Sequence, residues 1–358
     1  MKKLSLVFIV WVVIIYALTV KSASPAFFDY SYESTSMIKE SFPNVRHLLN
    51  FDGGHYQNIS SFGYIQKFQT DFFPLYPALI SFLGSLTQSH LISALVISLL
   101  CTYLSIWVLA KLFKAPQSVL VLIFFPLSFF FLTGYTESLF LLLSLLSWHL
   151  FKKQRYFSSG IFGFLASLSR FYGVLLFPSL LLEFFLKLPK SKRFKLSSYI
   201  QVIPLLLIPL GLAVYMYFLE LKFQDPLSFI HALSLWSKST VIFPFQTIYR
   251  YYKMLTTVSP AIIQYWVVLL EISSLIIGLL ASYILFRQKQ LSYSLYVFLG
   301  SIIPSFTGTL QSLPRYLLVL FPVYFIKFPP KLRLPLLVAG FTLQLVLLTA
   351  FLSGKFIA

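Results

Sequence analysis

A short polar run between apolar stretches contains the chain's strongest candidates for chemistry. It reads Asp52-Gly53-Gly54-His55-Tyr56. A carboxylate beside two glycines is open to whatever approaches the backbone, because glycine has no side-chain bulk. If Asp52 begins a helix, His55 and Tyr56 follow on its face at the i+3 and i+4 positions. The run indicates either a catalytic carboxylate with two substrate-binding side chains, or a helix-capping Asp with an interfacial His and Tyr.

Two further polar positions interrupt apolar segments. Glu137 opens an apolar stretch, where a carboxylate interacts favourably with the positive end of a helix dipole. Arg170 has no acidic neighbour in the sequence. An arginine among apolar helices needs a partner, and a phosphate is a natural one. Pairing of Arg170 with Glu137 is the structural alternative.

The tripeptide Pro314-Arg315-Tyr316 lies at the end of another apolar stretch. Arg315 either binds a lipid phosphate or extends its charge to the membrane surface. Metal ligands are sparse by comparison. His47, Asp52 and His55 offer nitrogen and oxygen ligands in one segment, but their spacing matches no recognised metal motif. We therefore expect no cofactor, with a divalent metal as the alternative.

The composition shows what kind of scaffold must position these residues. Of the 358 residues, 58% are hydrophobic and 11% are charged. A soluble domain of this length needs a larger polar shell. The apolar stretches approach about 20 residues, enough to cross a hydrocarbon core of roughly 30 Å as helix. The sequence predicts an all-α polytopic membrane protein, with residues 1–358 forming a single membrane domain.

The distribution of basic residues predicts the orientation in the membrane. Short connections that contain no Asp or Glu carry 17 of the 28 Lys and Arg residues: Lys2, Lys3, Lys111, Lys114, Lys152, Lys153, Arg155, Lys187, Lys190, Lys192, Arg193, Lys195, Arg287, Lys289, Lys327, Lys331 and Arg333. The positive-inside rule makes these connections, and the amino terminus, cytoplasmic. The net charge of +18 is therefore an orientation signal and does not predict nucleic-acid binding.

This orientation defines a path with about eleven membrane segments. The expected crossings are 4–20, 91–110, 117–132, 135–151, a hairpin of two short helices within 157–186, 197–219, 262–286, 291–308, 315–327 and 334–353. Two outer loops, 21–90 and 220–261, lie on the non-cytoplasmic side. Within the first loop, 72–87 is expected to form a short interfacial helix, because it contains Pro74 and Pro77.

The acidic residues support this path. Eight of the ten fall on the outer side: Asp29, Glu33, Glu40, Asp52, Asp71, Glu137, Glu220 and Asp225. Glu183 and Glu271 fall at or within membrane segments. An ionisable group at membrane depth is costly, so both are functional candidates by default.

The order of these motifs resembles the PIG-V mannosyltransferase family. Asp52-Gly53-Gly54-His55-Tyr56 with Gly63-Tyr64 is similar to the family signature W-D-x-x-H-Y…G-Y. Five further blocks follow in the family's order: Phe72-Phe73-Pro74-Leu75-Tyr76-Pro77, Tyr135 to Phe140, Ser169-Arg170 with Gly173, Asp225-Pro226 with His231, and Pro314-Arg315-Tyr316 with Phe321-Pro322. The likeness covers residues 45–325. Phe51 replaces the usual Trp, and the chain is shorter than the eukaryotic members.

The resemblance implies a GT-C glycosyltransferase fold and a polyprenyl-phosphate sugar donor, with mannose the expected sugar. Asp52 would be the catalytic base, and a glycan or glycolipid would accept the sugar at the non-cytoplasmic face. His55, Tyr56, Glu137, Arg170, Arg315 and Tyr316 would bind the substrates. Membrane lipid is the other expected partner. The length and simple architecture favour a prokaryotic cell membrane.

A polytopic transporter or lipid flippase is the alternative function. That class typically has broken helices, charges near the membrane midplane and internal repeats. In the predicted path the charges lie mainly at one face, and the sequence contains no obvious bilayer-sized repeat. These two features favour the transferase.

Overall fold

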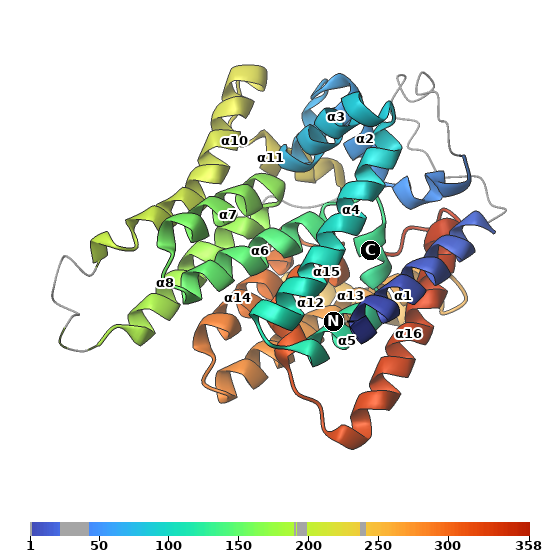
Figure 1. The fold of residues 1–358 in the computed structure, drawn as a ribbon. Coiled ribbons are helices and arrows are strands. Elements are labelled where there is room, and N and C mark those ends of the chain that lie inside the picture. Colours follow the sequence, from blue (N-terminus) through green and yellow to red (C-terminus); the bar gives the residue numbers. More distant parts are fainter. Residues whose placement is uncertain (1, 22–42, 190, 192–198, 237–240) are drawn as a thin grey trace. The chain divides into compact units, whose positions relative to one another are not determined.

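Every regular element in the described part of the chain is a helix (Figure 1). The computed structural model describes residues 2–21, 43–189, 191, 199–236 and 241–358, and no strand occurs among them. The chain divides into two compact units. The first unit comprises Met1–Leu142 and Lys327–Ile357, and the second comprises Leu143–Ile326 with Ala358. The prediction of a single domain over 1–358 stays a prediction.

Five helices in the described residues are long and apolar enough to cross a membrane. They are α1 (Lys2–Val20), α4 with its following π turn (His90–Leu112), α10 with the 3-10 turn before it (Ile203–Phe223), α13 (Ile263–Arg287) and α16 (Pro330–Leu352). They have 19 to 25 residues, and about 20 suffice to cross the hydrocarbon core. The predicted all-α class with membrane-length helices is confirmed, while the count of eleven and the GT-C fold stay predictions.

Four shorter helices of the first unit lie in the described part of the first predicted outer loop. They are η2 (Pro43–Leu49), α2 (Asp52–Phe62), η3 (Lys67–Asp71) and α3 (Leu75–Thr87). Helix α3 has only 13 residues, so the sequence correctly predicted a short helix within 72–87. Residues 22–42 lie outside the described residues, and the predicted outer positions of Asp29, Glu33 and Glu40 fall there.

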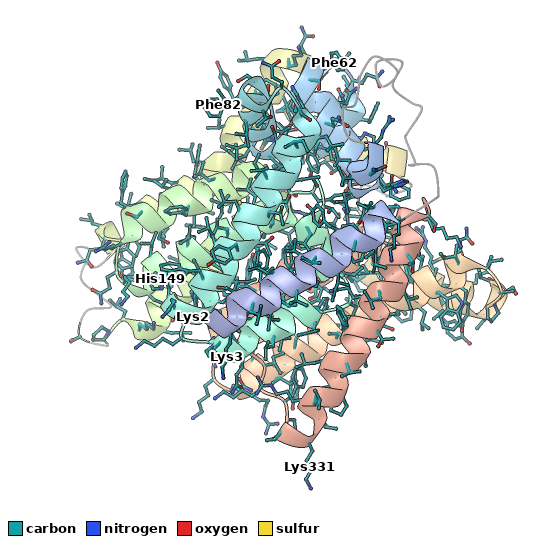
Figure 2. The ribbon with its side chains drawn as sticks, turned by 45° about the vertical axis from the view of Figure 1, so that its right-hand side comes forward. Lys2, Lys3, Phe62, Phe82, His149 and Lys331 are labelled. Carbon is teal, nitrogen blue, oxygen red and sulfur yellow. The ribbon has the colours of Figure 1, made fainter. Side chains whose placement is uncertain are left out.

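Figure 2 shows basic and aromatic side chains at opposite ends of the first unit. Lys2 and Lys3 at the start of α1 and Lys331 at the start of α16 lie at one end. Phe62 and Phe82, from the first predicted outer loop, lie at the other. This separation agrees with a basic side and a loop side, and the assignment of the basic side to the cytoplasm stays a prediction.

The predicted crossing at 117–132 is wrong as a continuous helix. Helix α5 (Pro116–Phe124) ends at Phe125, whose backbone is extended, with φ −66° and ψ 143°. The ring of Pro126 disfavours helical backbone at the residue before it. A 3-10 helix, η5 (Ser128–Leu132), follows the break.

Gln344 of α16 makes the hydrogen bonds that this break requires. Its Nε2 donates to the carbonyls of Ile123 at 3.1 Å and Phe125 at 2.7 Å. Its Oε1 accepts from the indole nitrogen of Trp11 in α1 at 2.8 Å. One fully buried side chain therefore joins three helices, and both figures show α1 and α16 side by side.

The predicted crossing at 315–327 is also broken. It consists of α15 (Leu313–Val319) and η11 (Phe321–Phe325). Pro322 has no N–H group and cannot continue the helix. The carbonyl of Leu318, four residues earlier, instead accepts a hydrogen bond from the hydroxyl of Tyr324.

The predicted hairpin within 157–186 is present as two helices that meet at Arg170. Helix α7 (Tyr156–Ser169) ends there, the 3-10 helix η6 (Phe171–Leu175) follows, and α8 (Leu176–Lys187) continues. Gly173 allows the chain to turn back closely on α7. A Cβ atom at Gly173 would lie 2.3 Å from the backbone nitrogen of Ser167.

The second unit contains one hairpin connection twice. The first joins α6 (Glu137–Lys152) to α7, and the second joins α13 to α14 (Leu291–Ile302). In the first, the hydroxyls of Ser147 and Ser159 each donate to the other residue's carbonyl, at 2.9 and 2.8 Å. Ser282 and Ser294 form the same reciprocal pair at 2.9 and 2.8 Å.

The backbone of the two connections agrees as well. Gln154 and Lys289 occupy the same place in each turn and are left-handed, both with φ 59°. Their amides donate to the carbonyls of Phe151 and Phe286, at 2.8 and 2.9 Å. Both turns follow a Leu-Phe pair and a basic residue. The repeat is hard to recognise in the sequence because only a few positions of the two connections share residue types.

The described residues of the second predicted outer loop form three short helices after α10. These are α11 (Ser228–His231), η9 (Ala232–Trp236) and α12 (Pro244–Thr257). The α14 helix ends in a 3-10 turn, η10 (Ile303–Thr307). The predicted crossing at 197–219 is shifted, because α10 proper spans Leu207–Phe223, and residues 192–198 lie outside the described residues.

The orientation can be tested with single cysteines in a Cys101→Ala background, since Cys101 is the chain's one cysteine. We expect cysteines at Ser191 and Gln288 to react only with reagents on the cytoplasmic side, because their connections are basic. Cysteines at Gln66 and Ser259 should react only from outside. All four positions are exposed. Outside labelling at Ser191 would refute the hairpin orientation.

The role of Gln344 predicts a stability effect. Gln344→Leu removes three buried hydrogen bonds and leaves two carbonyls and an indole N–H without that partner. We expect the free energy of unfolding in detergent to fall by about 2 kcal/mol, since bonds of this kind contribute roughly 0.6–2 kcal/mol each. Thr342→Leu changes an exposed position of the same helix and should not lower the melting temperature. Equal melting temperatures for both variants would contradict this role.

Candidate functional site

Asp52 is the first residue of α2, directly after a strained turn. Phe51 occupies the cap position with φ 57° and ψ −119°, an uncommon backbone for a residue with a side chain. Its ring packs against Phe351 and Phe356, with centroids 6.0 and 5.5 Å apart. The interpretation of Asp52 as the helix cap is wrong, because Phe51 holds that place. The half-buried Asp52 instead lies in the first turn, near the positive end of the helix dipole.

The two glycines differ from their expected role. A Cβ atom at Gly53 would lie 3.1 Å from Cβ of Leu49 and 3.4 Å from the carbonyl oxygen of Gly134. Gly53 is therefore buried where it allows close packing against another segment, and it does not open the backbone to a substrate. Gly54 is less confined, with its nearest such neighbour, the carbonyl oxygen of Leu49, at 3.6 Å.

His55 and Tyr56 are buried in an aromatic cluster. The His55 ring stacks on Phe72, with centroids 4.6 Å apart and planes 24° apart. Tyr56 meets Phe72 and Tyr76 edge-on, at 5.2 and 5.1 Å. The next sequence block, Phe72 to Pro77, thus packs directly on the polar run through Phe72 and Tyr76. The expected interfacial His and Tyr are wrong for these positions, since 3% and 6% of their surfaces are exposed.

The turn before α6, residues 134–136, packs against the polar run and the residues that precede it. The amide of Gly134 donates to the carbonyl of Leu48 at 3.0 Å, and the hydroxyl of Tyr135 donates to the carbonyl of Asn50 at 2.6 Å. The Tyr56 hydroxyl lies 3.4 Å from that of Thr136. These contacts bring the segments of Asp52 and Glu137 together within the first unit.

Glu137 is a buried carboxyl group at the start of α6. Only 1% of its surface is exposed. The hydroxyl of the adjacent Ser138 is buried and makes no hydrogen bond with a described residue. Burial of an ionisable group is costly, so the helix dipole alone is a weak reason for a glutamate here.

His47 lies in η2, shortly before Asp52, where the sequence suggested it as a possible metal ligand. Burial lowers its pKa, and the charge of Arg46 lowers the pKa further, whereas a hydrogen bond to the backbone of Leu352 raises it. The net shift favours a neutral ring at neutral pH. No group of three or more His, Cys, Asp or Glu side chains positioned to hold a metal occurs in the described part of the chain.

Arg170, Arg315 and Tyr316 belong to the second unit, where two of them meet. Arg170 has extended backbone (φ −158°, ψ 148°) between α7 and η6. Its guanidinium carbon lies 5.5 Å from the ring centroid of Tyr316. Such a position allows a cation–π interaction. The hairpin therefore places Arg170 beside Tyr316, the residue that follows Arg315.

Arg315 is buried in the same region. It is 4% exposed and donates from Nη2 to the hydroxyl of Ser312 at 3.2 Å. A side chain that snorkels to the membrane surface would keep its charged end in water, so the snorkelling interpretation of Arg315 is wrong.

Sequence reasoning missed Tyr172, which completes this cluster. Its ring lies 4.8 Å from that of Tyr316. Its hydroxyl is buried and makes no hydrogen bond with a described residue. The available signal was its position two residues after Arg170. A buried hydroxyl beside a guanidinium is suited to hold a phosphate oxygen.

Side-chain contacts account for two other features of the sequence, the Asp225–His231 segment and the two acids Glu183 and Glu271. In the second outer loop, Nδ1 of His231 lies 2.9 Å from Oδ2 of Asp225, whose Oδ1 accepts from the amide of Leu227 at 3.2 Å. These two contacts close a turn that begins at Asp225. Among the acids at membrane depth, Glu183 pairs with Lys187 at 2.7 Å, and Glu271 accepts from the hydroxyl of Tyr251. These contacts give both acids a stabilising role.

Comparison with known proteins identified no relative. No family model matches the chain, no curated protein matches it, and no solved structure matches it.

Proposed function

We propose that the protein is a membrane glycosyltransferase that moves a sugar, with mannose the expected one, from a polyprenyl-phosphate donor to a glycan or glycolipid. The observation that carries this proposal is the contact between the segment that contains Asp52, His55 and Tyr56 and the segment that leads to Glu137. The sequence resemblance assigns these four residues to a transferase site. The proposal places the site on the non-cytoplasmic side of a cell membrane, with the amino terminus in the cytoplasm.

In the proposed reaction Asp52 acts as general base. An acceptor hydroxyl oxygen attacks the anomeric carbon of the sugar, and the bond from that carbon to the phosphate oxygen breaks. The bonding electrons leave with the lipid phosphate, and the hydroxyl proton passes to Asp52. His55, Tyr56 and Glu137 hold the substrates in position, because a nucleophile must approach within about 3–3.5 Å of the carbon it attacks.

The resemblance assigns Arg315 and Arg170 to the leaving phosphate, where they would stabilise the negative charge that develops as the sugar departs. Tyr316 and Tyr172 orient the two guanidinium groups and contribute hydroxyl donors. The burial of Arg315 suits it to this role, because electrostatic interactions are stronger where water is excluded.

A transporter or lipid flippase is the second candidate, favoured by two observations. The serine-paired hairpin connection occurs twice, and the segments containing Pro126 and Pro322 are broken helices. Repeats and broken helices are typical of transporters. A sugar-transfer assay on purified protein with lipid-linked mannose separates the two, since a transporter moves its substrate without forming a glycosidic bond.

The base assignment predicts that Asp52→Asn abolishes most sugar transfer. Asparagine keeps the size and much of the hydrogen bonding but cannot accept the proton at neutral pH. Asp52→Glu should also be impaired, because a displacement of about 1 Å can cost on the order of 100-fold in rate. The measurement is the transfer rate at matched amounts of folded protein.

Glu220→Gln is the matched control for this test. It makes the corresponding change at an exposed carboxylate at the start of the second predicted outer loop, and it should keep transfer close to the wild-type rate. Near-normal transfer in Asp52→Asn would remove Asp52 from the role of base.

The phosphate assignment predicts that Arg315→Gln weakens use of the donor. Loss of a hydrogen bond to a charged group costs about 1.5–3 kcal/mol, or roughly ten- to a hundredfold in kcat/KM for the donor. The exposed Arg287 provides the control variant Arg287→Gln, which should transfer normally. Unchanged donor kinetics in folded Arg315→Gln would exclude this arginine from the site.

A further inference from the structure

Helix α12 is strongly amphipathic, with three separate faces. Phe245, Tyr249 and Tyr252 share one face and are 66%, 59% and 65% exposed. Thr247 and Tyr251 lie on the opposite, buried face. Residues three, four and seven apart share a helix face, so the three aromatic rings form a continuous stripe. Aromatic side chains with this arrangement are typical of helices that lie in the membrane interface.

Hydrogen bonds fix α12 onto the segment that follows α14. The hydroxyl of Thr247 donates to the carbonyl of Ser305 at 2.6 Å. The hydroxyl of Tyr251 accepts from the amide of Leu310 at 2.8 Å and donates to Glu271. The buried carboxylate of Glu271 thus anchors the helix, and α12 has a fixed position within the second unit.

The third face of α12 carries the cations and lines a pocket. Arg250, Lys253 and Thr257 follow one another at helical spacing on the flank between the aromatic and the buried stripes. Together with Met254, Gly308 and Thr309 they line a pocket of about 430 Å³. No carboxylate lines it, so its charge is complementary to an anion. Its walls are mostly apolar, which suits a ligand with a hydrocarbon portion.

We propose that this pocket binds an anionic phospholipid of the surrounding bilayer, with the lipid phosphate between Arg250 and Lys253. The aromatic stripe sets α12 at the depth of the headgroups, which brings the cationic flank to the level of lipid phosphates. The guanidinium of Arg250 and the ammonium of Lys253 donate to the phosphate oxygens, and the side chain of Met254 contacts the adjoining hydrocarbon. The site goes beyond the proposed transfer reaction and does not depend on it.

A bound lipid would also stabilise the segment that leads to Arg315. Arg250 donates to the carbonyl of Gly308 at 3.3 Å, and Gly308 is left-handed with φ 85°. Ser312, which accepts a hydrogen bond from Arg315, lies four residues later. A phosphate bound beside Arg250 and Thr309 would hold the Arg250 side chain against the backbone at Gly308, where the two already share a hydrogen bond. Lipid binding is therefore expected to raise thermal stability.

The test uses the full-length protein in detergent, titrated with phosphatidylglycerol or phosphatidylcholine and followed by native mass spectrometry. Lys253→Gln and Arg250→Gln should each weaken phosphatidylglycerol binding about fivefold, and the double variant about thirtyfold, since a basic residue at an anionic surface contributes about a fivefold factor. Lys253→Arg should bind like wild type. Phosphatidylcholine should bind more weakly to wild type and show no dependence on these residues.

The matched control is Arg287→Gln with Lys289→Gln, which removes two exposed cations from a different connection and should leave binding unchanged. Arg250→Gln also loses the contact to Gly308 and could unfold. Lys253→Gln avoids this problem, because the Lys253 side chain makes no hydrogen bond or ion pair with a described residue. Unchanged phosphatidylglycerol affinity in folded Lys253→Gln would overturn the proposal. Full displacement of the lipid by inorganic phosphate would overturn it as well.

Discussion

The structure depends on one constraint of the membrane interior: every backbone N–H and carbonyl group needs a partner within the protein, because hydrocarbon offers none. Two proline residues break helices here, and each break frees a carbonyl four residues before the proline. The hydroxyl of Ser128 donates to the carbonyl of Leu122, four residues before Pro126. The hydroxyl of Tyr324 does the same for Leu318, four residues before Pro322.

The same constraint explains how loop segments are held. The carbonyl of Phe131 accepts from the hydroxyl of Thr102 at 2.8 Å, and that of Leu132 accepts from Tyr16 at 3.3 Å. The side-chain amide of Asn50 donates from Nδ2 to the carbonyl of Phe351 at 2.9 Å. Irregular backbone is thus tolerated where distant side chains satisfy it. These bonds also position the residues before Asp52 and Glu137.

The two hairpin connections also use side chains to satisfy backbone carbonyl groups. Each uses a reciprocal pair of serines to join the helices that flank it. Serine is small enough to let two helices approach closely, and its hydroxyl can bond the neighbouring backbone. The proposed phosphate-binding residues follow from both hairpins, because α7 leads to Arg170 and α14 leads to Arg315. A rigid connection at one end of each hairpin favours a defined position at the other.

Sequence alone determined the helical class, the membrane-length apolar segments, the short helix before α4 and the two helices that meet at Arg170. These features follow from local rules: apolar length, the preferences of proline and the placement of charge. Tertiary structure decided which polar residues face one another. Glu183 and Glu271 were functional candidates in the sequence, as was Glu137, but Lys187 and Tyr251 lie beside the first two. Lys187 is one turn further along the same helix face as Glu183, whereas Tyr251 comes from a different helix than Glu271, and hydropathy records neither contact. The cap at Phe51, the packing of Gly53 and the burial of Arg315 depend on the same long-range contacts, so only the folded chain could reveal them.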